Sequence, residues 1–548
     1  MALVTGYVGF DLYLQGNRLF GHGPLDLLYD DLQLFVLGPF PLQQGGTGPL
    51  PAALQIARFA APLVTIYAFV EAGRLFLAGE LQRWRTLRAR RHVVVCGSGA
   101  AAVALTRRFN DLGARVVSIR ARPAVDGPTR RFLVDGDARL PETLRAAGVE
   151  RASALYACTD DTVTNTVIAL AARRMTQRGG TQLAVYALAT DPGLHLALQA
   201  RHLGHPRPAG GRFEFFNIDE LAARKLFDDP PCNAGLPHIL VIGATAFGRA
   251  VVVEQARRWR AGRPGTDLPP TVTLVDENAA EALADIARRY PFVAKVCRLL
   301  PHEEGLAALF DRPGEDLVPT MVLVCLDDEE ASLRTALTVD RLWHGGPGSL
   351  VVRLDRLSSL RDAFDGSAGD LLLDQMAGVL RLFGVVEAAC DPALIREDVT
   401  ERLARVVHDR YRAACLRRGV AVQDNPSMVD WERLPATQRD SCRAQAEDMG
   451  RKLRATGCTL APRGGPGDDH RLPEHTVEVL AEMEHQRWLA ERAQAGWRFA
   501  ERRADDRREH PDLVAWDRLS SVAKNKNRDA MRELMNIIGD AGFRIVRL

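Results

Sequence analysis

The residues best placed to do chemistry in this sequence form a glycine turn after an apolar run. His92–Gly97 reads HVVVCG, which is typical of a buried strand, and the turn that follows reads GSGAAA. In a strand–turn–helix unit, the first glycine permits the tight turn and the second lets the backbone approach a pyrophosphate, while a small third residue lets the helix pack on the strand. The helix that begins here would direct unpaired N–H groups at a phosphate. The candidate phosphate-binding residues are Gly97, Ser98, Gly99 and Ala102.

The strand expected next, ARVVSIR, ends in Arg120. A dinucleotide-binding unit usually carries an acid at this position, which binds the ribose hydroxyls. An arginine would suit a ribose 2′-phosphate or a ligand other than NAD, or it would simply point into solvent. We therefore leave the role of Arg120 open and keep it among the candidate contacts.

A fixed order of motifs follows: a Gly-Asp-Ala turn, a helix, a strand that ends CTDD, and a helix that bears an asparagine. This order closely resembles the nucleotide-binding half of the potassium-conductance-regulating family, the TrkA-N or RCK domains. The resemblance implies a Rossmann fold that gates channels and transporters by binding NAD(H), ATP, ADP or ions, without catalysis. It also implies that Asp137 and Thr159 line an adenosine pocket. The matching positions are Gly136, Asp137, Ala138, Thr159, Asp160, Asp161 and Asn165, of which Ala138 and Asp160 join the candidate cofactor contacts.

A second copy of this unit begins at PHILVIGATAFGRA. Thr245 stands where the close-approach glycine belongs, and its Cβ takes room from a pyrophosphate. The next strand, TVTLVDEN, ends in an acid, which the first copy lacks, and Met321–Leu342 repeats the layout of strand, Asp-Asp and helix. We expect one copy to bind a nucleotide while the other packs against it, and we favour the first. The candidate contacts in the second copy are Gly243, Gly248 and Asp276.

A soluble dehydrogenase is the competing interpretation, and it needs a proton-transfer residue. His195, His202 and His205 are candidates, but lone histidines in a leucine-rich helix are more commonly surface or core residues. The sequence has no nucleophile elbow, P-loop or HExxH motif. Its nine cysteines lack metal-ligand spacing, and a net charge of +2 gives no general attraction to nucleic acid. We expect no enzyme, no metal and no nucleic-acid partner, and NAD(H) or another adenine nucleotide as the ligand.

From about Ile395 the sequence becomes helical and charged, and it repeats itself. Trp431-Glu-Arg-Leu434 matches Trp516-Asp-Arg-Leu519 at an offset of 85 residues. Such self-similarity predicts a duplicated helical module. Further pairs at this offset are Arg439 with Lys524, Arg443 with Arg528, Leu453 with Ile538 and Gly457 with Gly542, and His408-Asp-Arg-Tyr411 corresponds to His485-Gln-Arg-Trp488 at a shorter offset.

The second copy, over Val477–Leu548, strongly resembles the RyR domain, a module first seen as tandem repeats in ryanodine receptors. His485 and Trp488, which is three positions later, would lie one turn apart on one face of a helix. With further tryptophans and arginines they could form an aromatic slot for a purine and its phosphates, or the tryptophans could be the core of a small helical domain. The first copy lacks the GW and HP pairs and looks degenerate. The candidate ligand contacts are His485, Trp488, Trp497, His510, Trp516 and Arg528.

The N-terminal residues differ from the rest. Leu54–Gly79 is largely apolar and about long enough to span a bilayer as a helix, and five arginines from Arg83 to Arg91 follow it. Such a basic cluster places the downstream chain in the cytosol. With the short apolar Met1–Leu14 and an amphipathic segment between, this order resembles the two-helix pore module of potassium channels. Val36–Phe40 reads VLGPF and not TVGYG, so potassium selectivity is not supported. A soluble helical hairpin is the alternative.

The expected fold class is α/β, with an N-terminal membrane helical hairpin, two Rossmann-like doubly wound parallel sheets and C-terminal all-α tandem RyR modules. The expected function is a membrane-anchored nucleotide-sensing regulator or a ligand-gated, potassium-like cation channel. It would lie in the inner membrane, with the bulk of the chain cytoplasmic, as a homo-oligomer (dimer or tetramer). A non-conducting nucleotide-sensing adaptor is the first alternative, and a soluble NAD(P)-dependent oxidoreductase is the second. The expected domains are residues 1–82, 83–230, 231–394, 395–462 and 463–548.

Overall fold

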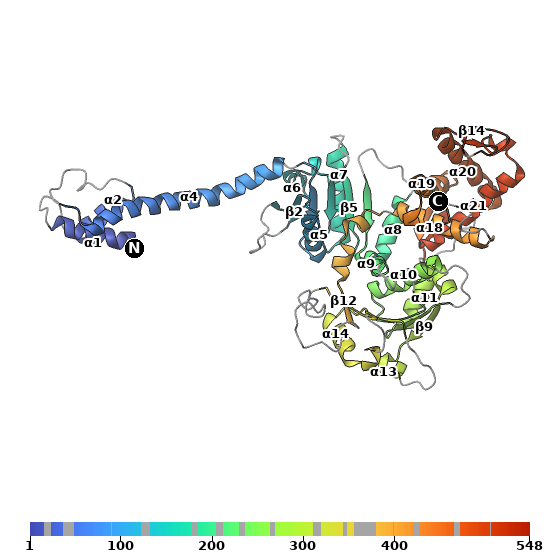
Figure 1. Ribbon diagram of the computed structural model, residues 1–548, viewed down its shortest axis with the longest axis horizontal. Coiled ribbons are helices and arrows are strands. Elements are labelled where there is room, and N and C mark those ends of the chain that lie inside the picture. Colours follow the sequence, from blue (N-terminus) through green and yellow to red (C-terminus); the bar gives the residue numbers. More distant parts are fainter. Residues whose placement is uncertain are drawn as a thin grey trace. The chain divides into compact units, whose positions relative to one another are not determined.

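The computed structural model of the 548-residue chain (Figure 1) divides into two compact units, Met1–Arg88 and Ala89–Leu548. The structure describes residues 1–15, 23–36, 49–88, 90–121, 132–177, 183–203, 212–228, 236–262, 269–310, 319–343, 348–355, 380–397, 399–417, 419, 425, 427–464, 472–504 and 506–547.

The first unit is a small helical cluster. Pro24 occupies the first turn of the middle helix. A backbone N–H has no partner within the helix there, so its absence from proline costs no hydrogen bond. The side chains of Phe10, Leu34 and Leu54, one from each helix, are almost completely buried together. The helices are α1 (Ala2–Leu14), α2 (Pro24–Leu34) and α4 (Ala52–Arg88).

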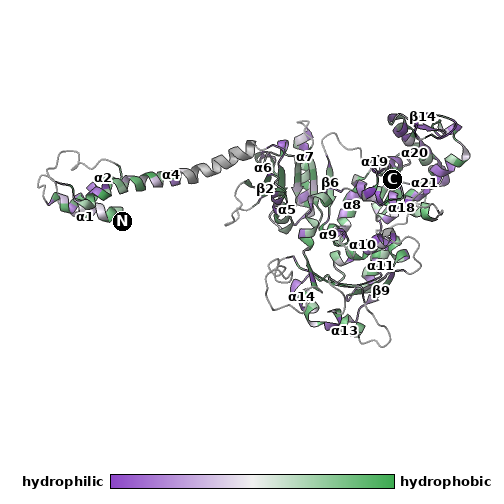
Figure 2. Cartoon of the chain, in the orientation of Figure 1, coloured by the Kyte–Doolittle hydropathy of each residue, from purple (hydrophilic) through white to green (hydrophobic). Residues whose placement is uncertain are grey.

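Among the described residues, Ala52–Gly73 within α4 is the helix segment long and apolar enough to cross a membrane, with a mean hydropathy of 1.6. Most of its apolar side chains are exposed in this unit, Phe69 by 75%. Apolar residues predominate along this part of α4 (Figure 2). The helix continues to Arg88, so the domain boundary expected after residue 82 lies inside it. The segment expected to occupy the place of a filter lies outside the described residues, except Val36.

The second unit begins with a six-stranded parallel sheet in the order β3-β2-β1-β4-β5-β6. This is the order of a dinucleotide-binding Rossmann sheet, with a switch point between its first and fourth strands. The strands are β1 (Val93–Cys96), β2 (Val116–Arg120), β3 (Leu133–Asp135), β4 (Ala154–Ala157), β5 (Ala184–Leu188) and β6 (Phe213–Phe216). The helices are α5 (Ala100–Asp111), α6 (Pro141–Ala146), α7 (Thr162–Gln177), α8 (Pro192–His202) and α9 (Ile218–Leu226), with the 3₁₀ turn η1 (Val149–Arg151).

A second parallel sheet repeats this topology in the order β12-β11-β10-β7-β8-β9. The strands are β7 (His238–Ile242), β8 (Thr271–Val275), β9 (Arg298–His302), β10 (Met321–Val324), β11 (Leu350–Arg353) and β12 (Leu380–Phe383). The helices are α10 (Ala246–Gly262), α11 (Ala279–Arg289), α12 (Pro291–Val296), α13 (Gly305–Phe310), α14 (Glu329–Thr338), the 3₁₀ turn η3 (Asp340–Trp343), α16 (Val385–Ala389) and α17 (Pro392–Ile395).

The central strands are apolar throughout because both of their faces are covered by helices. Val93 and Val95 of β1 point into one core, and Val94 and Cys96 point into another. The core that contains Val93 continues through the facing side of the second sheet and into the C-terminal helices. The two Rossmann units and the helical region therefore share one hydrophobic core.

The C-terminal region is helical, and each copy of the repeat also ends in a strand, which the sequence did not predict. The first copy consists of α18 (Val399–Arg417), the 3₁₀ turn η6 (Trp431–Arg433), α19 (Ala436–Ala455) and β13 (Cys458–Pro462). The second consists of α20 (Glu474–Gln494), β14 (Arg498–Phe499), β15 (Glu509–His510), the 3₁₀ turn η7 (Trp516–Arg518), α21 (Ser521–Asp540) and β16 (Phe543–Arg547).

The two copies are joined by an antiparallel ribbon in which β13 pairs with β16. Leu460 is paired with Ile545, which lies 85 positions later, and Pro462 is paired with Phe543 on one side while Cys458 is paired with Arg547 on the other. Equivalent residues of the two copies therefore meet at the centre of the ribbon. This register gives the tandem a local two-fold symmetry.

Candidate functional site

The first glycine turn has the geometry that a phosphate cradle requires. Gly97 has a φ of 129°, and a Cβ there would overlap the carbonyl oxygen of Cys158. Gly99 precedes α5 in an extended conformation, where a Cβ would lie 2.5 Å from Oδ1 of Asp160. Ala102 is 2% exposed against the sheet. Side chains larger than those present would therefore fill the approach to the turn or separate α5 from the sheet.

The first turn of α5 presents N–H groups without a side-chain cap. Gly99 supplies no side-chain acceptor, and Ser98 and Ala100 are exposed. The first N–H groups of a helix have no partner within the helix and bind anions well. This end of α5 can therefore receive a phosphate.

The residues expected around the ribose and adenine lie at the ends of β2 and β3. Arg120 ends β2, and its buried Nε has no hydrogen-bond partner among the described residues. Asp137 follows β3 and accepts hydrogen bonds from Arg139, with Nη2 at 2.7 Å from Oδ2. These bonds hold the pKa of the Asp137 carboxyl below its ordinary value. Ala138 beside it is buried. Arg139 was not identified from the sequence, although its position two residues after Asp137 could have indicated an ion pair between them.

A buried asparagine fixes the loop after β4. The amide oxygen of Asn165 accepts hydrogen bonds from the backbone N–H (2.8 Å) and hydroxyl (2.7 Å) of Thr159. Its Nδ2 donates to the carbonyl oxygens of Thr159 and Leu188, both at 2.9 Å. Asn165 thus positions Thr159 beside the glycine turn. The sequence marked Asn165 as a matching residue without indicating this role.

The second glycine turn differs because its own side chains satisfy its donors. Thr245 Oγ1 donates to the carbonyl of Cys325 (2.7 Å) and accepts from the N–H of Gly248 (3.2 Å). Asp276 accepts from the N–H of Ala244 at 2.8 Å. A Cβ on Gly248 would overlap the carbonyl oxygen of Gly243. In the second copy, Thr245 therefore takes up the N–H of Gly248, and the expected ribose acid Asp276 is bonded to the turn itself.

Five aromatic rings of the second helical copy form one cluster. Trp488 lies 5.1 Å from His510 and 5.8 Å from His485, between ring centroids. His485 also contacts Trp516 at 5.8 Å, and Trp497 contacts His510 at 6.4 Å. The three tryptophans and His510 are only partly buried. The structure therefore brings five of the six expected RyR contacts together in an accessible position.

The sixth residue, Arg528, is paired with a carboxylate of α20. It binds Glu478, with Nη2 at 2.9 Å from Oε1. Hydrogen bonds from Arg528 and Trp516 to Glu478 hold the pKa of this carboxyl below its ordinary value. Arg528 thus acts on Trp516 through Glu478 and is not part of the ring cluster.

Two other cations lie over the rings, and the sequence motifs did not indicate them as contacts. The guanidinium carbon of Arg492 is 4.6 Å from the centroid of Trp497 and 5.7 Å from that of Trp488. Lys524 Nζ is 5.6 Å from the centroid of Trp516. Arg492 could have been found from its spacing, because it lies four residues after Trp488 on the same helix face.

The first helical copy repeats this framework with its tryptophan buried. Nε2 of His408 lies 2.8 Å from the carbonyl oxygen of Val429, as Nε2 of His485 does from that of Val514. Trp431, the counterpart of Trp516, is 5% exposed. The first copy therefore keeps the scaffold but offers no comparable open tryptophan.

Among the three candidate proton-transfer histidines, the structure describes the side chain of His195 alone. His195 is 2% exposed, and its Nε2 is 3.6 Å from Oε2 of Glu220. Glu220 also binds Arg402 of α18 at 3.0 Å. The side chain of His202 and the whole of His205 lie outside the described residues. His195 thus belongs to a contact between the first Rossmann unit and the helical region.

Comparison with known families confirms the two resemblances expected from the sequence. The family model described as TrkA-N domain matches residues 93–201. The family model described as RyR domain matches residues 470–547. These ranges contain the first glycine turn and the aromatic cluster, respectively.

The chain is also similar to several solved structures. A structure of GsuK bound to ADP is 14% identical, with 71% of this chain and 93% of that chain covered and a TM-score of 0.37. The GsuK channel is 14% identical, with coverages of 72% and 95% and a TM-score of 0.38. A dipicolinate synthase chain from Bacillus halodurans is 11% identical, with coverages of 60% and 98% and a TM-score of 0.22.

Proposed function

We propose that this chain is a membrane-anchored, nucleotide-sensing regulator whose first Rossmann unit binds NAD(H) or another adenine nucleotide. The observation that carries the proposal is the contrast between the two glycine turns. The turn at Gly97–Ala102 leaves the donors of α5 without side-chain partners, whereas Thr245 and Asp276 occupy those of the second turn. The open turn also lies within the range that matches the TrkA-N domain.

The proposed ligand lies along the carboxyl edge of the first sheet. Its phosphates meet the first turn of α5, and its sugar meets the ends of β2 and β3. Arg120 supplies a cation there, and Thr159 and Asp137 flank the adenosine. Ligands of open α/β sheets bind at this edge, where the strand order reverses.

The N-terminal unit supplies the proposed membrane anchor. Ala52–Gly73 meets the length and composition of a spanning helix, and the arginines of positions 83–91 follow it. The positive-inside rule then places the Rossmann and RyR parts in the cytoplasm, at the inner membrane. A ligand-gated cation channel, potassium-like in its layout, is the stronger form of this proposal, and a non-conducting adaptor is the weaker form.

A homo-oligomer is part of the proposal because α7 carries an apolar stripe. Val163, Val167 and Leu170 recur at helical spacing and are exposed by 64%, 42% and 39%. Contiguous exposed apolar side chains of this kind mark association surfaces. A second copy of the chain is the proposed occupant.

The aromatic cluster of the RyR domain is the second proposed sensor. Its partly buried tryptophans offer ring faces to a purine, and Arg492 and Lys524 stand beside them to meet phosphates. A ligand that binds one arrangement of the chain better than another would shift the equilibrium between them.

The test of the nucleotide site is Gly99→Leu in the full-length chain. A leucine would fill the space that the pyrophosphate needs, so we expect affinity for NAD(H), ADP or ATP to fall at least tenfold while the thermal unfolding temperature changes little. Isothermal titration calorimetry measures the affinity. Ion flux in proteoliposomes, with and without nucleotide, then separates a channel from an adaptor.

Thr245→Val is the matched control in the second turn. It replaces the hydroxyl with a methyl group of similar size, and we expect it to leave nucleotide affinity unchanged. If the Gly99 variant binds as tightly as the wild type, or if the Thr245 variant loses binding instead, the assignment to the first copy is wrong.

A further inference from the structure

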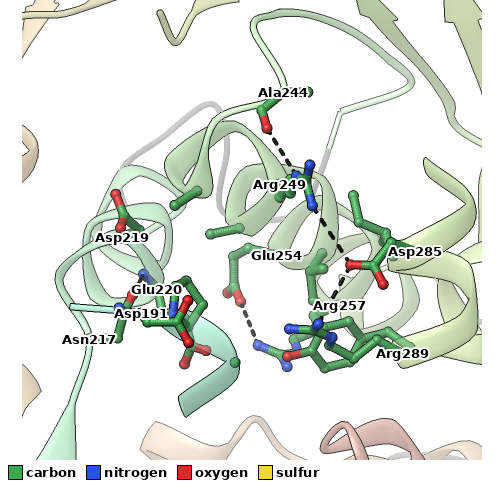
Figure 3. Close-up of a pocket in the computed structure, with 17 residues that line it drawn as sticks. Asp191, Asn217, Asp219, Glu220, Ala244, Arg249, Glu254, Arg257, Asp285 and Arg289 are labelled. Atoms are coloured by element: carbon green, nitrogen blue, oxygen red, sulfur yellow. Dashed lines mark hydrogen bonds and ion pairs between the residues drawn. The ribbon is translucent and has the colours of Figure 1, made fainter. Parts of the chain in front are cut away.

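A cavity of about 330 Å³ lies between the two Rossmann units (Figure 3). One wall is formed by the first turns of α8 and α9, and the other by α10 and α11. Its lining residues do not include Gly97, Gly99 or the tryptophans of the RyR domain. Its volume is that of a small-molecule site.

The charges of this interdomain cavity are segregated between its walls. The wall from the first Rossmann unit carries three carboxylates and an amide, and among the described lining residues it has no cation. The wall from the second unit carries three guanidiniums and two carboxylates. The residues are Asp191, Asn217, Asp219 and Glu220 on the first wall, and Arg249, Arg257, Arg289, Glu254 and Asp285 on the second (Figure 3).

The carboxylates of the second wall are already neutralised from outside the cavity. Glu254 accepts a hydrogen bond from Arg258 at 2.7 Å, and Asp285 accepts one from Arg288 at 2.7 Å. Neither Arg258 nor Arg288 lines the cavity. The guanidiniums that do line it therefore represent a surplus of positive charge on this wall.

Arg249 donates a hydrogen bond to the carbonyl of Ala244 at 2.9 Å, whereas Arg257 and Arg289 are paired with carboxylates only at longer distances. Arg257 is 3.6 Å from Glu254, and Arg289 is 3.6 Å from Asp285, distances beyond a charge-assisted hydrogen bond. The buried Nε of Arg289 has no hydrogen-bond partner in the described part of the chain. Arg257 and Arg289 therefore have N–H donors free for an anionic group.

On the first wall, Asp219 is the carboxylate least engaged by hydrogen bonds. Asp191 accepts a hydrogen bond from the N–H of Leu194, and Glu220 is bound by Arg402. Asp219 makes no hydrogen bond within the described residues. Burial raises the pKa of its carboxyl to about 6, although the nearby charge of Arg353 opposes this. A cationic group beside Asp219 would relieve the cost of burying its charge.

We propose that the interdomain cavity binds a small zwitterion of the amino-acid type. Arg257 and Arg289 hold its carboxylate, and Asp219 holds its ammonium. Each end of the ligand then contacts a different Rossmann unit, so that binding stabilises one relative arrangement of the two units.

The RyR domain touches the wall of the same cavity. Tyr290 lines the cavity and is 8% exposed. On its other side, a Cβ on Gly542 would lie only 2.6 Å from the tyrosine ring, so the glycine backbone packs directly against it. The bound zwitterion is thereby in contact, through Tyr290, with the turn that leads into β16. The cavity therefore adjoins all three parts of the second unit.

The experiment is isothermal titration calorimetry of the full-length chain with each of the twenty amino acids, with succinate as an anion-only probe and putrescine as a cation-only probe. We expect at least one amino acid to bind at sub-millimolar concentration, and succinate and putrescine to bind at least tenfold more weakly. Asp219→Asn and Arg289→Gln should each weaken the amino acid at least tenfold, because each removes one charge-assisted contact.

Arg298→Gln, an exposed arginine of β9 away from the cavity, is the control and should leave binding unchanged. The proposal is overturned if no amino acid binds at 10 mM, if succinate binds as tightly as the best amino acid, or if both cavity variants keep wild-type affinity. The Gly99→Leu variant should still bind the amino acid, so the failure of the nucleotide site and that of this cavity are distinguishable.

Discussion

One side chain distinguishes the two glycine turns. Where the first copy has Gly99, the second has Thr245, whose hydroxyl bonds to both Cys325 and the N-terminal N–H of Gly248. The threonine thus takes the place of a phosphate oxygen and also closes the approach to it. Two turns built on nearly the same pattern therefore offer very different sites.

At the same scale, Asp219→Asn is expected to stabilise the protein in a pH-dependent way. The folded-state pKa of Asp219 is raised from 3.8 to about 6, so the folded state binds the proton more tightly than the unfolded state. Stability falls as pH rises through this window, and the cost is complete above pH 6. At pH 7.5 the asparagine variant should be more stable by up to about 3 kcal/mol, with the gain disappearing near pH 4.

Thermal unfolding at pH 7.5 and near pH 4 measures this difference. Asp111→Asn, at an exposed position at the end of α5, serves as the control and should show no gain at either pH. An equal gain for Asp219→Asn at both pH values would show that burial of its charge is not the cause.

At the scale of elements, the two RyR copies form a two-fold pair in which one contact between them is polar on one side only. Lys452 of α19 is 1% exposed and binds Glu484 of α20 and, at 3.1 Å, Asp448. The corresponding residues of the other copy are Ile537 and Val407, both buried and apolar. A buried ion pair thus joins α19 to α20. At the symmetry-related contact, between α21 and α18, apolar residues take its place.

Replacing Lys452 alone by Ile should therefore destabilise the tandem by about 3 kcal/mol, because Glu484 would lose a partner in the interior. The double variant with Glu484→Val matches the apolar side. It also removes an acceptor of Arg487, which keeps Glu491 as a partner, and we expect it to recover at least half of that loss. Chemical denaturation of the single and double variants measures the interaction free energy between Lys452 and Glu484. A double variant no more stable than the single one would show that the buried pair contributes more than its apolar counterpart.

At the scale of the whole second unit, Asp540 joins three parts of the fold. It accepts hydrogen bonds from Arg260 of α10 at 2.9 Å and from Arg410 of α18 at 2.6 and 2.8 Å. Because Asp540 belongs to α21, its carboxylate connects both RyR copies to the second Rossmann unit. Arg402 of α18 makes the corresponding connection to the first Rossmann unit through Glu220.

Asp540→Asn should lower the free energy of unfolding by about 3 kcal/mol, since two partly buried guanidiniums lose their shared anion. We also expect faster hydrogen exchange at the ends of α10 and α21, which a change confined to one helix would not produce. Asp529→Asn, in an exposed pair with Arg532 on α21, should change stability by no more than about 0.5 kcal/mol. Unchanged exchange at α10 in the Asp540 variant would contradict a connecting role.

The sequence by itself determined the units of this protein. Apolar strands followed by glycine turns predicted two Rossmann sheets, and the 85-residue repeat predicted the duplicated helices, because local patterns of apolar residues fix secondary structure and its pairing. The TrkA-N and RyR resemblances followed from the same short motifs. The clustering of His485, Trp488 and Trp516 was expected as a slot, on helical spacing and this resemblance.

Only the tertiary structure decided how those units meet. The bonds of Thr245 to Cys325 and of Asp276 to Ala244, the ribbon of β13 with β16, the contacts of Asp540 and the charge-segregated interdomain cavity all join residues far apart in the chain. No local pattern encodes such contacts, because they depend on the directions in which separate helices and strands present their side chains. Asp219 and Arg289 lie 70 positions apart in the sequence, and only the packing of α9 beside α10 and α11 places them on opposite walls of one cavity.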